Sequence, residues 1–184
     1  VKLPFAGEHN ARNALAAAAV ARVLGVSVEA IASGLESASN IGGRLSRRIL
    51  ANGATLIDDS YNANPASMRA AAGVLLAQPG PKFMVIGDMA EMGSSSEEMH
   101  QALLAEFAKL PFAAVLTLGE RMQRAATAMG IPLDRVATFT DIDALAAEVK
   151  TRLTPDAAML VKGSRSMAME RVIQKLEPTH KGTH

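Results

Sequence analysis

The sequence predicts an α/β fold: a short helical segment, then a mostly parallel sheet of about six strands with one antiparallel edge strand. Two observations support this prediction. From residue 54 onward, short apolar runs alternate with stretches of helical character, as in repeated strand–helix units. The apolar runs do not alternate between polar and apolar residues, which is typical of strands that helices cover on both faces. The 184 residues are enough for one sizeable domain and a smaller appendage.

The N-terminal segment predicts two helices. Residues 8–25 carry apolar side chains at helical spacing, and Gly25 suits the end of that helix because glycine readily adopts a positive φ. Ser27 is a candidate N-cap for a second helix over residues 28–38, because its hydroxyl can accept a hydrogen bond from a free backbone N–H.

A small, polar, glycine-rich stretch, "SNIGGR" at residues 39–44, marks the predicted domain boundary. We expect a helical segment over residues 1–40, a larger domain over residues 41–178 and a disordered tail over residues 179–184. The chain opens on Val1 instead of Met, so we expect it to be part of a longer protein.

The larger domain begins with a predicted hairpin. Asn52-Gly53 is a strong signal for a two-residue turn, which makes the strand before it the antiparallel edge. The strands expected after this turn are residues 55–58, 83–86, 114–118, 136–139 and 159–161.

Helices fill the gaps between these strands, and their starts carry capping signals. Asn64 and Asp141 are candidate N-caps, and Pro65 suits a first helical position. The Ser94-x-x-Glu97 spacing predicts a capping box. The expected helices are residues 65–78, 95–109, 120–129, 142–153 and 165–176.

Composition argues against several classes of function. Lys plus Arg number 19 and Asp plus Glu number 18, so the chain lacks the positive charge that nucleic acid or an anionic membrane attracts. Cysteine is absent, and the four histidines show no metal-ligand spacing, so we expect no metal site. No G-x-x-x-x-G-K-[ST] or G-x-G-x-x-G loop follows a strand, so the usual phosphate-binding motifs are missing.

Polar residues follow every predicted parallel strand, where ligands bind in sheets of this kind. The stretches at 58–62 and 162–166 are the richest, and the second places two cations and serines at a strand end. That pattern suits an anion, although a solvated basic turn is the plain alternative. Asp59 is either a ligand-binding residue or a cap or surface acid. His100 is expected to be a structural histidine.

Four motifs carry a family resemblance. "GEHNARNALAAAAVA", "DDSYNANPASM", "GDMAEMG" and "LVKGSRSMAMERV" together resemble the Mur ligases, in particular the subgroup that adds D-alanyl-D-alanine. The resemblance runs from about residue 4 to residue 176. It implies that residues 1–40 are the helical tail of a central ATPase domain and that the rest is the C-terminal, Rossmann-like domain of the family.

The resemblance also implies an activity. Members of this subgroup use ATP to activate the carboxylate of UDP-N-acetylmuramoyl-tripeptide as an acyl phosphate, which the amine of D-Ala-D-Ala attacks during peptidoglycan synthesis. The family P-loop and the ligands of Mg²⁺ lie upstream of this segment, so the chain is expected to be inactive without the missing N-terminal and central domains. The family further implies a monomer. From the charge balance we expect no nucleic-acid or membrane partner, and the lack of cysteine fits a cytoplasmic protein.

The resemblance assigns residues on the nucleotide side of the site. Asn13 resembles the asparagine that bonds adenine, Arg44 the linker arginine that reaches phosphate when the domains close, and Asp59 the acid that accepts ribose hydroxyls. The full nucleotide set is His9, Asn10, Asn13, Arg44, Asp59 and Tyr61. No other catalytic residue is expected in this segment.

A second set is assigned to the peptide substrates. A basic group is expected to hold a peptide carboxylate, an acidic pair to meet the ammonium end, and two asparagines to lie near the centre of the site. The basic group is Lys162, Ser164 and Arg165. The acidic pair is Asp88 and Glu91, and the asparagines are Asn62 and Asn64. The competing hypothesis is a non-catalytic nucleotide- or peptide-binding module that keeps this fold. Folylpolyglutamate synthase shares the architecture but not the DDSYNANP and KGSRSM motifs.

Overall fold

The computed structural model describes residues 1–4, 7–38, 43–130 and 135–177. The chain divides into two compact units, Val1–Ile41 and Gly42–His184. The tail predicted over residues 179–184 lies outside the described residues.

The first unit is a pair of helices, α1 (Glu8–Val23) and α2 (Val28–Ser37). The Ser27 hydroxyl accepts from the backbone N–H of Ala30 at 3.2 Å, which confirms the predicted N-cap. Gly25 has φ +83° just past the end of α1, as a glycine at this place should. No residue of α2 is buried, and α1 exposes Leu15 and Val20.

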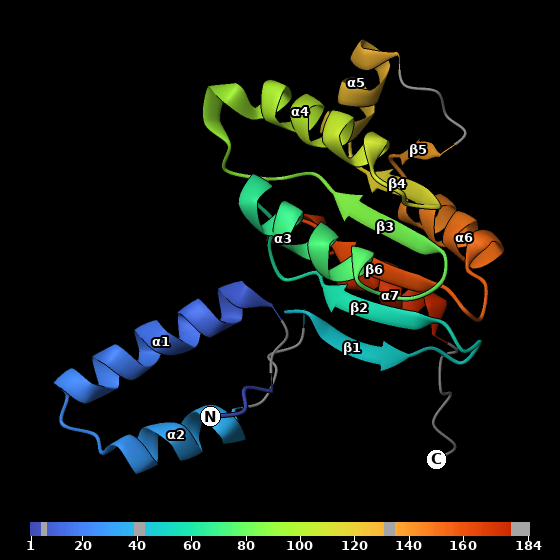
Figure 1. The fold of residues 1–184 in the computed structure, drawn as a ribbon. Helices are drawn as coiled ribbons and strands as arrows, with labels where there is room; N and C mark the ends of the chain where they lie inside the picture. The colour runs from blue at the N-terminus through green and yellow to red at the C-terminus, as the bar shows by residue number, and fades with distance from the viewer. Residues whose placement is uncertain (5–6, 39–42, 131–134, 178–184) are drawn as a thin grey trace, which may run out of the picture. The chain divides into compact units, whose positions relative to one another are not determined.

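The second unit is built on a six-stranded sheet, counted over the described residues, in the order β1-β2-β6-β3-β4-β5 (Figure 1). One edge pair is antiparallel and every other neighbouring pair is parallel, which confirms the predicted fold class. The strands are β1 Ser46–Ile49, β2 Thr55–Asp59, β3 Lys82–Gly87, β4 Ala114–Leu118, β5 Val136–Phe139 and β6 Ala158–Lys162.

Strand β6, the last in the chain, lies between β2 and β3. In register, Asp59 of β2 stands beside Lys162 of β6, which in turn stands beside Ile86 of β3. The carboxyl ends of these three strands are therefore level with one another. The chain order reverses at this place, and that is where ligands bind in doubly wound sheets.

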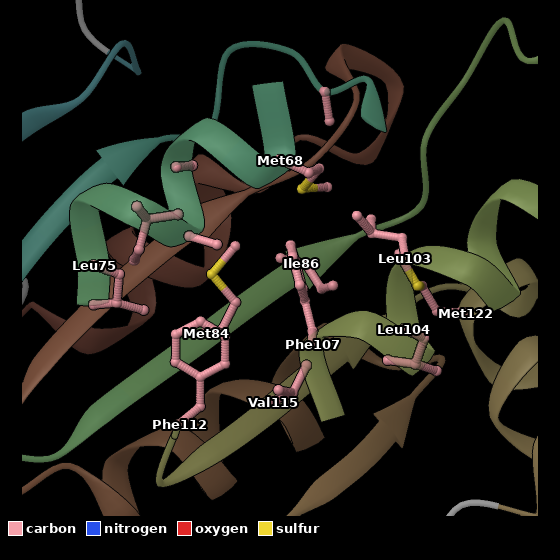
Figure 2. Close-up of a cluster of buried hydrophobic side chains, with 14 of the residues drawn as sticks. Met68, Leu75, Met84, Ile86, Leu103, Leu104, Phe107, Phe112, Val115 and Met122 are labelled. Carbon is pink, nitrogen blue, oxygen red and sulfur yellow. The ribbon is translucent and has the colours of Figure 1, made fainter. Parts of the chain in front are cut away.

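Helices cover both faces of the sheet (Figure 1). Helices α3 (Pro65–Leu76), α4 (Ser96–Lys109) and α5 (Glu120–Met129) pack on one face, and α6 (Ile142–Arg152) and α7 (Glu170–Leu176) pack on the other. On the first face, the methionines, leucines and Phe107 interdigitate with the strand side chains, and Phe112 meets Phe107 edge to face (Figure 2). Both strand faces are thus buried, which explains their continuous apolar runs.

Two predicted helix caps are confirmed. The Asn64 side chain accepts from the Ser67 N–H at 2.8 Å, and the Ser67 hydroxyl accepts from the Asn64 N–H, which completes a capping box. The Asp141 carboxylate accepts from the N–H of Ala144 at 2.8 Å. None of the helices in the described part of the chain has both the length and the apolar character needed to cross a bilayer.

The predicted two-residue hairpin turn is wrong. Leu50 and Ala54 still pair, so residues 51–53 form a three-residue turn with φ +98° at Gly53. A two-residue Asn-Gly turn requires a positive φ at both residues, and Asn52 does not have one. The Asn52 side chain instead accepts from the Ala54 N–H and donates to the carbonyl of Leu153, more than a hundred residues away in sequence.

Two helix starts also differ from the prediction. The Ser94–Glu97 capping box does not form, because a 3₁₀ turn, η1 (Gly93–Ser95), leads directly into α4. Residues 165–176 are not one helix: a second 3₁₀ turn, η2 (Arg165–Met167), ends at Ala168 with φ +46°, and α7 starts at Glu170. This break brings Met169 into the core, where it is fully buried.

Candidate functional site

The ends of β2 and β6 are joined by a buried ion pair. The ammonium of Lys162 lies 2.6 Å from a carboxylate oxygen of Asp59 and also donates to the carbonyl of Asn62 at 2.8 Å. Lys162 is only 3% exposed. A buried charge needs a partner, and this one has a carboxylate and a carbonyl from the protein itself. Lys162 therefore holds the loop after β2 in place. Its predicted role as a ligand for a peptide carboxylate stays a prediction.

Asp59 also reaches the segment that precedes β1. Its second carboxylate oxygen accepts from the N–H of Leu45 at 3.2 Å. Nearby, the N–H of Tyr61 donates to the carbonyl of Gly43 at 2.9 Å, and the Arg44 guanidinium lies over the Tyr61 ring at 4.5 Å from its centroid. Three predicted nucleotide-side residues, Arg44, Asp59 and Tyr61, are thus brought together in the second unit.

Leu45 is a member of this group that the sequence did not reveal. Its φ is +50°, a left-handed conformation that is uncommon for a residue with a side chain. Leucine shows no preference for this conformation, so no local pattern predicts it. The hydrogen bond to Asp59, fourteen residues away, is what distinguishes the position.

Asp88, at the end of β3, holds a helix from a distance. Its two carboxylate oxygens accept from the N–H groups of Arg121 and Met122, at 3.1 and 2.9 Å, in the first turn of α5. A Cβ at Gly119 would lie 2.5 Å from either oxygen, so the close approach requires glycine there. The carboxylate that was predicted to meet a ligand ammonium is therefore already bonded to two amides of the protein.

His100 fixes the next residue of the same loop. It is fully buried, and its Nε2 accepts from the N–H of Met89 at 2.9 Å. Its Nδ1 lies 2.6 Å from the carbonyl of Ser96, and since a carbonyl only accepts, Nδ1 carries the proton. Arg121 donates to the carbonyl of Met89 at 2.8 Å. His100 is thus a structural histidine, as expected from the sequence.

The turn after β6 is divided between buried and exposed groups. Ser164 is buried, its N–H donates to the carbonyl of Asp88 at 3.1 Å, and its hydroxyl lies 3.1 Å from that of Ser166. Arg165 is exposed and pairs with Glu170 at 2.7 Å. A Cβ at Gly163 would lie 2.5 Å from the buried Met169 side chain. The predicted basic group is therefore split, because Lys162 faces inward while Arg165 reaches solvent.

The remaining predicted residues lie around these strand ends or in the first unit. Asn62 is exposed and accepts from the N–H of Ala63, Asn64 caps α3, and Glu91 is exposed with φ +60°. Asn10 and Asn13 are one helical turn apart on α1, which places them on the same side of that helix. The side chain of His9 lies outside the described structure.

No metal site is formed by the part of the chain that the structure describes. Nowhere in it do three or more histidine, cysteine, aspartate or glutamate side chains gather closely enough to hold a metal ion. Asp59 and Asp88 are each bonded to protein donors instead.

Comparison with known proteins identifies the family. Residues 43–165 match the family profile described as "Mur ligase, glutamate ligase domain". The chain belongs to the Mur ligase family. This segment contains the ends of β2, β3 and β6, so the contacts of Asp59, Asp88, His100 and Lys162 described above lie within the matched Mur ligase domain.

Relatives that belong to the Mur ligases extend the match across nearly the whole chain. UDP-N-acetylmuramoyl-tripeptide–D-alanyl-D-alanine ligase of Escherichia coli is 42% identical over 181 residues, which are 96% of this chain and 39% of that protein. The enzyme of the same name from Bacillus subtilis is 33% identical over 95% of this chain and 39% of its own length.

Solved Mur ligase structures agree. MurF from Acinetobacter baumannii superposes with a TM-score of 0.82 at 42% identity, over 96% of this chain and 39% of that one. The MurF ligase of Thermotoga maritima, solved in complex with ADP, gives a TM-score of 0.77 at 27% identity, over 94% and 38%. The chain therefore spans about two fifths of the length of these Mur ligases.

Proposed function

We propose that this chain is the C-terminal part of an ATP-dependent ligase that joins D-Ala-D-Ala to UDP-N-acetylmuramoyl-tripeptide in peptidoglycan synthesis. One observation carries the proposal: relatives named for this activity resemble the chain at 32–42% identity over at least 94% of its length. The reaction makes an acyl phosphate from the tripeptide carboxylate and ATP, and the dipeptide amine then displaces the phosphate.

The proposed chemistry needs positioned charge more than covalent help. Phosphoryl transfer depends on holding the reactants in line and on neutralising the charge that spreads over the phosphate oxygens. Arg44 is exposed, and among the described residues no carboxylate lies within ion-pair distance of it, so its charge is available to phosphate. We assign it the phosphate contact. His9, Asn10 and Asn13 are proposed to shape the adenine pocket, and Asp59 and Tyr61 to face the nucleotide.

The substrate side of the proposal follows exposure. Arg165 and Glu91 are exposed, so they are the groups proposed to meet the carboxylate and the amine end of a peptide. Ser164, Asn62 and Asn64 are proposed to line the same region. Lys162 and Asp88 are proposed to act mainly by holding these loops, because their charges are already bonded within the protein.

Mg²⁺ enters the proposal only as a partner of the missing part. Magnesium is bound by oxygen ligands together with substrate phosphates. The described residues contain no cluster that fits it, so its ligands are assigned to the domains upstream, together with the P-loop. We place the whole enzyme in the cytoplasm as a monomer, where ATP and the nucleotide-linked substrate are found.

The test is an assay of the full-length protein with its upstream domains. Phosphate release from ATP should require both UDP-N-acetylmuramoyl-tripeptide and D-Ala-D-Ala, and mass spectrometry should show the pentapeptide product. Glutamate, L-alanine and a diamino acid serve as control acceptors. An intact protein that prefers one of these controls, or that binds ATP and dipeptide without joining anything, contradicts the proposal. The second outcome supports the non-catalytic binding module.

A further inference from the structure

The segment that leads into β1 is tied to the loop after β2 at two points. The N–H of Tyr61 donates to the carbonyl of Gly43 at 2.9 Å, and the N–H of Leu45 donates to a carboxylate oxygen of Asp59 at 3.2 Å. We call this arrangement the clasp, made of Gly43, Arg44 and Leu45 on one side and Asp59 and Tyr61 on the other. Arg44 lies between the two tied residues, so its backbone is held on both sides.

The backbone of the clasp is unusual on both sides of Arg44. Gly43 has φ +78° and Leu45 has φ +50°. A Cβ at Gly43 would lie 3.0 Å from the Tyr61 nitrogen, a tight contact that a side chain could form only if the two segments moved slightly apart. Leu45 keeps a left-handed conformation while its side chain packs against the core cluster. Residues in such conformations persist only where the surrounding structure holds them there.

The other side of the clasp is anchored in the sheet. Lys162 pairs with Asp59 at 2.6 Å and donates to the carbonyl of Asn62 at 2.8 Å, so β6 fixes the loop both before and after Tyr61. Lys162 and Asp59 have side chains only 4% and 13% exposed. The loop that carries the tyrosine ring is therefore bonded to the end of β6 on both sides of Tyr61.

Arg44 uses that platform. Its guanidinium carbon lies 4.5 Å from the centroid of the Tyr61 ring, which is a cation–π contact. Both side chains remain accessible: Arg44 is exposed and Tyr61 is 44% exposed. A ring contact leaves the guanidinium N–H groups free to donate to an anion, whereas an ion pair would occupy them.

We propose that Tyr61 is a positioning residue that acts through Arg44, by holding the guanidinium in place for an anionic partner. The inference rests on the proposed function, in which that partner is a phosphate of ATP. This role differs from an independent contact between Tyr61 and the nucleotide. If Tyr61 acts through Arg44, the ring contributes to activity only while Arg44 is present.

A double-mutant cycle in the full-length ligase separates the two roles. Tyr61→Ala should lower kcat/KM for ATP by about two- to fivefold, the size of an exposed cation–π contact. Tyr61→Phe should keep kcat/KM for ATP near that of the parent enzyme, because the ring is kept. In the Arg44→Ala background, which is itself impaired, Tyr61→Ala should cause no further loss, since residues that act as one unit are not additive.

Three results overturn the inference: equal losses from Tyr61→Ala with and without Arg44, a Tyr61→Phe variant as poor as Tyr61→Ala, or an Arg44→Ala variant with full activity. A parent enzyme without ligase activity contradicts the proposed function instead. In that event the contact between Arg44 and Tyr61 is still decided by a measurement that needs no turnover.

That measurement is NMR of the chain itself. The ring should shift the side-chain protons of Arg44 upfield, and Tyr61→Leu should move them to the position of a solvated arginine while Tyr61→Phe leaves them in place. Arg165 is the matched control, because it is exposed and pairs with Glu170 instead of a ring. Arg44 resonances that ignore Tyr61→Leu overturn the inference.

Discussion

Lys162 shows how burial changes the meaning of a charged residue. A cation at a strand end, beside a serine and an arginine, suggests a ligand for an anion, and the sequence offers no sign that an aspartate 103 residues earlier will pair with it. Burial decides the matter, because two charges with little solvent access depend on each other. Residue types near the site were therefore predictable, but their partners were not.

Replacing Lys162 should be costly. Lys162→Met removes the ammonium that pairs with the largely buried carboxylate of Asp59, which should lower the free energy of unfolding by about 3–5 kcal/mol. Adding Asp59→Asn should recover part of that loss, because the negative charge that faced the ammonium is removed. Urea denaturation measures both. Arg69→Met is the control: its pair with Glu106 is roughly half exposed, so the loss should stay below about 1 kcal/mol. Similar losses in the two single variants would show that the buried pair has no special weight.

Thr117 offers a prediction of the opposite sign. Its hydroxyl is buried in β4 and has no hydrogen-bond partner among the described residues. Thr117→Val should raise the free energy of unfolding by about 1 kcal/mol, because an unsatisfied polar group is removed. Thr127→Val, whose exposed hydroxyl donates to the carbonyl of Gln123, should bring no gain. A destabilised Thr117→Val variant would mean that the hydroxyl has a partner after all.

At the scale of elements, local signals succeeded where the answer is local. Strands β4 and β5 run over the residues predicted from their apolar runs, and Asn64 and Asp141 cap the helices that they precede. Helix α5 has no side-chain cap of its own, and its free amides are met by Asp88 from another strand. Such a cap joins residues more than thirty positions apart, which no pattern within one helix reveals.

The contact between Asp88 and α5 depends on Gly119. Gly119→Ala should lower the free energy of unfolding by about 3 kcal/mol or more, because φ +122° disfavours a side chain and the new methyl group would strike the Asp88 carboxylate. Gly130→Ala is the matched control. It also has a positive φ, of +56°, but no atom of the described residues lies within 4 Å of the added Cβ, so about 1–2 kcal/mol is expected. Chemical denaturation measures the free energy of unfolding of both variants. Equal losses would show that the Asp88 carboxylate moves aside at no energetic cost.

His100 supports the same loop from the other side. His100→Leu keeps an apolar body in the core but leaves the buried N–H of Met89 without an acceptor, at a cost of about 1–3 kcal/mol. Hydrogen exchange at the Met89 amide should accelerate in this variant before the sheet amides do. His100→Gln, whose side-chain oxygen can accept, should recover part of the protection. Unchanged exchange at Met89 in His100→Leu would rule out this account of the loop.

At the scale of the whole molecule, stability resides in the second unit. Both core clusters consist of residues from Leu45 to Leu176, whereas α2 buries nothing and α1 exposes several apolar side chains. Exposed apolar surface of this kind marks an interface. We infer that the exposed apolar side chains of α1 and α2 belong to such an interface.

Truncation tests this division. A chain of residues 43–184 should unfold cooperatively at a melting temperature within a few degrees of that of the full chain, because both cores are retained. Thermal unfolding followed by circular dichroism measures it, with α-helical signal lost in proportion to the deleted helices. A truncated chain without a cooperative transition would show that α1 and α2 contribute to the fold of the second unit.

The place of β6 in the sheet also determines when the sheet can be completed during translation. Strands β2 and β3 leave the ribosome before β6, yet they cannot pair with each other, because β6 lies between them in the sheet. Lys162 is synthesised 103 residues after Asp59, which takes roughly 5–20 s at ordinary rates of translation. During that interval β2 and β3 each have an edge without its neighbouring strand. A chain released before residue 158 lacks β6, so β2 and β3 stay unjoined.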